Sequence, residues 1–229
     1  LSGGKTIGYT KDLNFSPLNY KLNGYSLSLD YQRNNIEAGN LLSVELAFGK
    51  NKLKSKSLQD YPTDHLTGGL QVGYLKRLKQ FNNEATFLLG GQVKMDFNYL
   101  SFLENEAYSF LIAHTLDIKA GFTIPITDHQ KLSTTLSIPL LTFLVRPPYV
   151  GFDEEFDENL QRPLKFITDG YFTSFNEYMA FDWDINYTYF LSEKWSANLT
   201  YELAYQRTNE ENKFINFQNS IELGITHKF

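Results

Sequence analysis

The chain has 229 residues, no cysteine and a formal net charge of −5 at pH 7. The absence of cysteine excludes a disulfide framework, a thiolate metal site and a cysteine nucleophile, and the net negative charge disfavours nucleic acid as a partner because like charges repel. Mean hydropathy is −0.35, and no stretch approaches the roughly 20 apolar residues that a transmembrane helix needs.

Polar and apolar residues alternate along most of the chain, and a period of two is typical of strands. In chain order the alternation predicts ten strands, at residues 5–15, 18–33, 41–53, 65–78, 84–99, 107–126, 131–146, 178–190, 194–206 and 214–229. The first is the least regular because Lys11 falls on its apolar face. The second changes face near Asn23, which we interpret as a β-bulge.

The predicted connections differ in length, and the short ones fall at one end of the sheet. Residues 79–83, 128–130 and 191–193 form tight turns, whereas residues 54–64 and 147–177 form long loops. An even number of antiparallel strands with this arrangement is typical of outer-membrane barrels. We therefore expect an all-β, transmembrane, antiparallel up-and-down barrel of about ten strands, forming a single domain over residues 1–229. A water-soluble barrel with its apolar face inward is the alternative, since its strands alternate too.

The last predicted strand carries a more specific pattern. Glu222, Gly224 and a terminal Phe229 resemble the assembly signal of bacterial outer-membrane β-barrels, although His227 stands where an apolar residue is usual. The resemblance implies insertion by the barrel-assembly machinery of a Gram-negative outer membrane, contact with lipid and lipopolysaccharide, and two periplasmic termini. The abundance of Asn, Lys, Tyr and Phe is similar to that of proteins from the Bacteroidota.

Charged residues on the inward face predict a lumen closed by ion pairs, because a barrel of this size is nearly filled by side chains. Arg77 and Glu84 flank one short turn and are expected to face each other, and Asp117 and Lys119 are neighbours on one face. Lys94 and Asp96 belong to the same expected network.

Three carboxylates are expected to converge in one wall. Pairing across the turn at 191–193 places Asp182 nearly opposite Glu202, with Asp184 two residues along. Such a cluster needs either a lysine from across the lumen or a bound cation. Paired carboxylates are also used by hydrolases, so catalysis at these residues is an alternative.

Known enzymatic barrels offer a comparison. The omptin proteases use an Asp-x-His element near the extracellular rim, and the lipid A deacylases use a His-x-Ser element late in the barrel. Neither occurs in this sequence; only His65, preceded by Asp64, is expected at the rim. We therefore expect no enzyme activity, cofactor or metal.

His114 is expected on the lipid-facing side of its strand near mid-depth, where a polar side chain is costly unless it is covered. Either a protein partner docks on this wall or the assigned register is wrong. Thr142 and Arg146 are expected on the outward face of the next strand, which favours a covered wall.

The longest loop is acidic and aromatic, with its charge at Asp153, Glu154, Glu155, Asp157 and Glu158. It is either a solvated rim or a surface that binds a ligand or partner. Taken together, the sequence predicts a non-enzymatic accessory or binding subunit of a cell-envelope complex. The alternatives are a narrow channel for small solutes or cations and a hydrolase that uses lumen carboxylates.

Overall fold

The computed structural model describes residues 1–35, 39–56, 63–81, 84–102, 107–146, 169–209 and 212–228. Almost all of them lie in strands. Their bounds are β1 Ser2–Asp12, β2 Tyr20–Asn35, β3 Asn40–Lys54, β4 Thr63–Gln80, β5 Thr86–Phe102, β6 Ala107–Thr127, β7 Gln130–Val145, β8 Tyr171–Thr173, β9 Tyr178–Phe190, β10 Trp195–Thr208 and β11 Phe214–His227. Among these residues no helix is long and apolar enough to cross a membrane.

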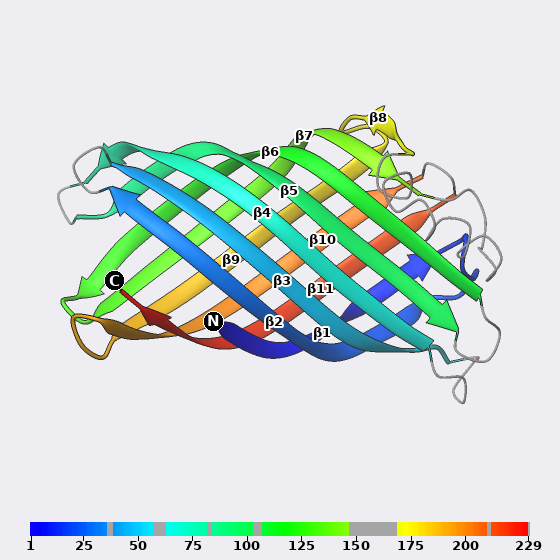
Figure 1. Ribbon diagram of the computed structural model, residues 1–229, viewed down its shortest axis with the longest axis horizontal. Coiled ribbons are helices and arrows are strands. Elements are labelled where there is room, and N and C mark those ends of the chain that lie inside the picture. The colour runs from blue at the N-terminus through cyan, green and yellow to red at the C-terminus, as the bar shows by residue number, and fades with distance from the viewer. Residues whose placement is uncertain are drawn as a thin grey trace.

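The ten long strands form one closed antiparallel barrel (Figure 1). Each strand pairs with its neighbour in sequence, and β1 pairs with β11 from Ser2 opposite Gly224 to Asp12 opposite Phe214. The connections β2–β3, β4–β5, β6–β7 and β9–β10 share one end of the barrel with Leu1 and Lys228, and we call it the turn end. The opposite end is the loop end. The predicted all-β barrel of about ten strands is confirmed.

The short strand β8 was not predicted. It pairs only with β7, from Thr142 opposite Thr173 to Leu144 opposite Tyr171. The β7–β9 ladder ends nearer the turn end, at Ser137 opposite Asp182. β8 therefore continues that side of β7 toward the loop end, at the top of Figure 1.

Side chains alternate between the lumen and an apolar outer wall. On β2, Tyr25 and Leu29 point outward and are 73 % and 59 % exposed, whereas Ser28 points inward and is buried. The outward apolar stretch is bounded by Asn23 and Arg33. Ten residues of strand at about 3.3 Å each, tilted by roughly 40°, span about 25 Å, which matches the height of the apolar belt of a membrane barrel.

Toward the loop end the inward face itself becomes apolar. Its buried members converge on the barrel axis from most of the strands: Tyr20, Leu22, Leu53, Leu100, Leu111, Ala113, Leu144, Tyr178, Ala180 and Phe214, joined by Phe15. The predicted bulge near Asn23 is wrong, because the register of β2 against both neighbours is continuous. What changes near Asn23 is the chemistry of each face and not the register.

A real bulge lies in β7. Its pairing with β6 passes from Leu141 opposite Leu116 to Pro139 opposite Asp117, which leaves Leu140 without a partner residue. The extra residue reverses the two faces beyond it. Thr142 and Arg146 are consequently buried on the lumen side, and their predicted place on an outward, partner-facing wall is wrong.

Candidate functional site

The turn-end part of the lumen is organised around the carboxylate of Glu222, which is only 2 % exposed. Ser2 Oγ donates to it at 2.5 Å and Ser28 Oγ at 3.1 Å, and Ser26 Oγ donates a third hydrogen bond. Gly224 leaves room for Ser2, because a Cβ at Gly224 would lie 2.9 Å from that of Ser2. Two residues of the predicted assembly signal thus join the last strand to the first two, while Phe229 lies outside the described residues.

The predicted acidic cluster is brought together with its register shifted by two residues. Glu202 lies opposite Asp184, and Asp182 lies opposite Ala204. The shift arises because β10 begins only at Trp195, so the turn is longer than predicted. Hydroxyl groups bind two of the acids: Ser220 Oγ donates to Glu202 at 2.9 Å, and Thr135 Oγ1 donates to Asp184 at 2.9 Å.

The third acid, Asp182, is paired with a lysine from across the lumen. A lysine was one of the two partners expected for the acidic cluster, the other being a bound cation. Lys94 Nζ on β5 lies 2.5 Å from Asp182 Oδ2 on β9 and 2.9 Å from Asp96 Oδ2. Because β5 and β9 are not neighbours in the sheet, this ion pair spans the barrel interior. One lysine therefore compensates two carboxylates at the middle of the lumen.

Asp117 and Lys119 lie on one face, as predicted, and a glutamine bridges them. Gln92 Nε2 donates to Asp117 Oδ2 at 2.8 Å, and Lys119 Nζ donates to Gln92 Oε1 at 3.0 Å. Gln92 is nearly fully buried. The predicted ion pair is thus replaced by an amide-linked chain.

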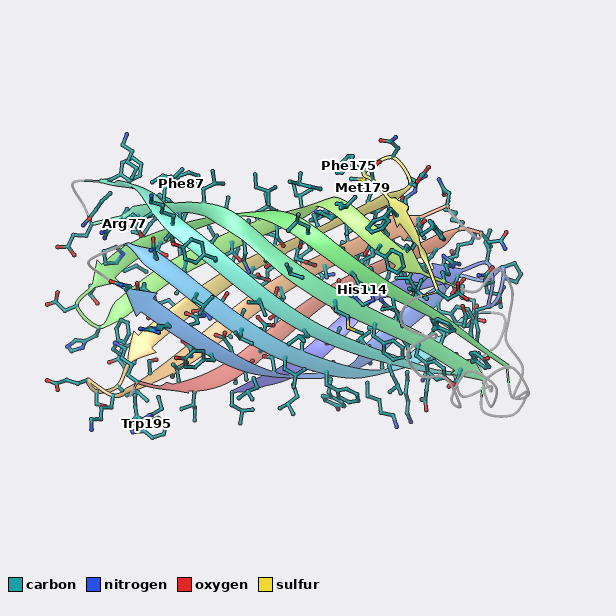
Figure 2. All side chains as sticks on the ribbon, turned by 45° about the horizontal axis from the view of Figure 1, so that its top comes forward. Arg77, Phe87, His114, Phe175, Met179 and Trp195 are labelled. Atoms are coloured by element: carbon teal, nitrogen blue, oxygen red, sulfur yellow. The ribbon has the colours of Figure 1, made fainter. Side chains whose placement is uncertain are left out.

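The predicted pairing of Arg77 with Glu84 is wrong. Arg77 lies opposite Leu88, and a bulge at Leu78 shifts the register beyond it. Glu84 lies in the turn before β5, exposed and with a φ of 62°. Arg77 also lies at the turn end (Figure 2), but its backbone N–H donates to Gly39 O at 2.7 Å.

Between Lys94 and the loop end, His65 belongs to a network of side-chain amides. His65 Nε2 lies 3.2 Å from Asn98 Oδ1. Asn98 Nδ2 donates to Gln206 Oε1 at 3.0 Å, and Gln206 Nε2 donates to Asp96 Oδ2 at 3.1 Å. His65 is fully buried in the lumen, whereas Asp64 points to the outer wall. The two therefore form no acid–base pair at the rim.

Near the loop end, Arg146 Nη2 lies 2.6 Å from Asp12 Oδ1, and both side chains are fully buried. Asp12 also accepts from Ser109 Oγ at 2.7 Å and from Asn14 N at 2.9 Å. The Arg146 guanidinium lies 5.4 Å from the centre of the Phe214 ring, so this charged group sits against the apolar cluster. Alternation alone could not predict this pair, because its formation depends on the bulge at Leu140.

His114 lies on the outward face, as predicted, opposite Met95 and Phe143. Its ring centre is 6.1 Å from that of Phe143, which in turn contacts Phe172 of β8 at 5.1 Å. The Nε2 atom is buried and has no hydrogen-bond partner among the described residues. The chain's own aromatic residues thus cover at least part of this wall.

The acidic loop residues Asp153, Glu154, Glu155, Asp157 and Glu158 lie outside the described residues. Within the described ranges no group of three His, Asp or Glu side chains is arranged to hold a metal ion. A shallow cavity of about 260 Å³ opens on the outer wall between Phe87, Phe122 and Trp183. The lumen itself is crossed by stacked layers of bonded side chains, an arrangement suited to rigidity.

Comparison with known proteins gives the fold alone. No protein-family model and no curated protein matches the chain. Among solved structures, the outer membrane protease OmpT of Escherichia coli is similar with a TM-score of 0.51 and 8 % identity, over 100 % of this chain and 93 % of that chain. The translocator domain of the autotransporter NalP from Neisseria meningitidis gives 0.48 and 6 %, over 100 % and 86 %. The likeness to OmpT shows that the chain has the fold of bacterial outer-membrane β-barrels, as the resemblance of its last strand implied.

Proposed function

We propose that the protein is a non-conducting, non-enzymatic barrel of the bacterial outer membrane that serves as an accessory or binding subunit of a cell-envelope complex. The observation that carries the proposal is the filled lumen. The ion pair between Lys94 and Asp182 crosses the interior, and the apolar cluster and the buried Arg146–Asp12 pair lie between it and the loop end. A solute would have to displace each of these layers.

In this proposal the barrel is an anchor, and its contacts with other molecules are made at its surface. The termini and short turns lie in the periplasm, and the loop end faces outward from the cell. The connections support this placement. β7 and β8 are separated by residues 146–170 at the loop end, and outer-membrane barrels have short periplasmic turns and longer extracellular loops.

The carboxylates give little support to a hydrolase. Asp182 is paired with Lys94, and Asp184 and Glu202 each accept a hydroxyl hydrogen bond. These contacts satisfy the acids within the protein. A purely structural role for the three is the simpler interpretation.

Planar-bilayer recording tests the absence of conduction. The wild-type protein is expected to show no steady unitary conductance. A variant that combines Lys94→Gly, Asp96→Gly and Asp182→Gly should stay closed as well, because the apolar cluster and the Arg146–Asp12 pair still block the path. A steady conductance in the wild-type protein would refute the closed lumen. For the accessory role, the native mass of the protein in mildly solubilised membranes should exceed 26.5 kDa beyond the contribution of bound detergent, and a bare monomer would contradict it.

A further inference from the structure

The outer wall of β2 and β3 changes from apolar to basic toward the loop end. On β2, Lys21 lies beyond the apolar stretch that begins at Tyr25. On β3, Lys50, Lys52 and Lys54 follow Phe48 on the outward face. All four lysines are exposed. We call these four residues the lysine patch.

The strand register concentrates the positive charge. Lys21 lies directly opposite Lys54, and Lys52 lies opposite Asn23. The neighbouring strand β4 contributes one carboxylate, Asp64, opposite Lys52. None of the ion pairs within 4.0 Å among the described residues includes a member of the lysine patch. With Asp64 counted against the four lysines, three positive charges remain.

The surplus positive charge of the lysine patch favours the binding of an anion from outside the chain. Like charges directly opposite each other on two strands are destabilising, so the Lys21–Lys54 pair costs free energy in the isolated protein. The chain is acidic overall, and the basic surplus is therefore local. A bound anion between the two strands would remove the repulsion.

The position of the patch identifies that anion. Asn23 marks the edge of the apolar belt on β2, and Lys52 lies beside it. An anion at this height is at the level of lipid headgroups, and the chains of the same lipid would lie against Tyr25 and Phe48, which are 73 % and 55 % exposed. Lysine suits this place because its flexible stem can lie along the apolar surface while its ammonium group reaches the interface.

We propose that the lysine patch binds the phosphate groups of an anionic lipid at the loop-end interface of the membrane. Lys21, Lys52 and Lys54 contact the phosphate, and Tyr25 and Phe48 contact the hydrocarbon chains. The proposal uses the orientation of the outer wall in a bilayer and does not depend on whether the lumen conducts.

Native mass spectrometry of the full chain in uncharged detergent tests the binding. Dioleoyl phosphatidic acid is titrated against dioleoyl phosphatidylcholine, which has the same chains. Each lysine near a phosphate contributes roughly fivefold, so the variant K21Q/K52Q/K54Q should bind phosphatidic acid about a hundredfold more weakly. The control K76Q/K79Q/K194Q removes the same charge from exposed lysines at the turn end and should stay within about threefold of the wild type.

Each result bears on the proposal. Equal losses in both variants would reduce the effect to net charge, and unchanged binding in the patch variant would place the lipid elsewhere; either overturns the proposal. Inorganic phosphate at the same phosphate concentration should not compete. If it competes fully, the site binds free phosphate and the lipid assignment is wrong. Heat-dependent gel mobility confirms that each variant is folded.

A single substitution gives a second test through a change of sign. In phosphatidylcholine vesicles, Lys21→Gln removes a repulsion and should raise the urea midpoint of unfolding or leave it unchanged. In vesicles that contain phosphatidic acid, the same substitution removes a phosphate contact and should lower the midpoint. A shift of the same sign and size in both lipids contradicts the proposal.

Discussion

Replacement of Arg146 by methionine tests the buried ion pair near the loop end. Removing one partner of a fully buried pair usually costs about 3–5 kcal/mol, because the remaining charge is left in a medium of low polarity. Here Asp12 keeps two donors, Ser109 Oγ at 2.7 Å and Asn14 N at 2.9 Å, which hold the carboxylate in part. We therefore expect Arg146→Met to lower the free energy of unfolding by about 3 kcal/mol.

The double variant D12N/R146M separates the ion pair from simple packing. With both charges removed, the asparagine retains Ser109 and Asn14 as partners, and the loss should fall to about 1 kcal/mol. Lys76→Met, at an exposed site, serves as the control and should change stability by less than about 0.5 kcal/mol. The assay is urea unfolding in vesicles, followed by intrinsic fluorescence and gel mobility. A loss below about 1 kcal/mol in Arg146→Met would refute the buried pair.

Four further predictions follow from single contacts. Lys94→Met leaves Asp96 and Asp182 without their shared cation and should lower the free energy of unfolding in urea by about 3 kcal/mol. The double variant K94M/D182N should recover part of that loss. An unchanged stability in Lys94→Met would mean that the ion pair does not form. Glu222→Gln keeps the shape but weakens three serine contacts and should slow refolding into vesicles, with Glu193→Gln, an exposed turn residue, as the control. A Cβ at Gly8 would overlap the carbonyl oxygen of Phe217, so Gly8→Ala should reduce the folded fraction on gels far more than Gly3→Ala. His114→Leu removes an unsatisfied polar atom from the lipid face and should raise stability by about 1 kcal/mol in vesicles; a loss of stability would indicate a contact that the wall needs.

The number and order of the long strands could be predicted because period two reports which residues share a face. On β5 the inward positions Lys94 and Asp96 were identified from alternation alone. The same reasoning failed on β2, where Tyr20 and Leu22 are inward and Lys21 is outward. There the environment of the wall changes from lipid to water, so the polarity of each face inverts while the register stays constant.

The contacts within the lumen were less predictable than the strands. The run from Ile138 to Leu141 is apolar at three of four positions with Pro139 between them, so it carries no sign of which residue is the bulge. Missing the bulge placed Arg146 on the wrong face and concealed its pairing with Asp12. Contacts across the lumen, such as Lys94 with Asp182, join strands that are not neighbours, and pairwise strand reasoning contains no information about them.

The bond between the last strand and the first two has a consequence for biogenesis. The three serine hydroxyls that satisfy Glu222 belong to a hairpin made from the opposite end of the polypeptide, about two hundred residues earlier. Until those segments meet, the growing sheet has two open edges and an acid without its donors. Closure of the barrel by pairing of β1 with β11 is therefore a single late event. Until closure occurs, the open edges of the sheet have to be shielded from other chains.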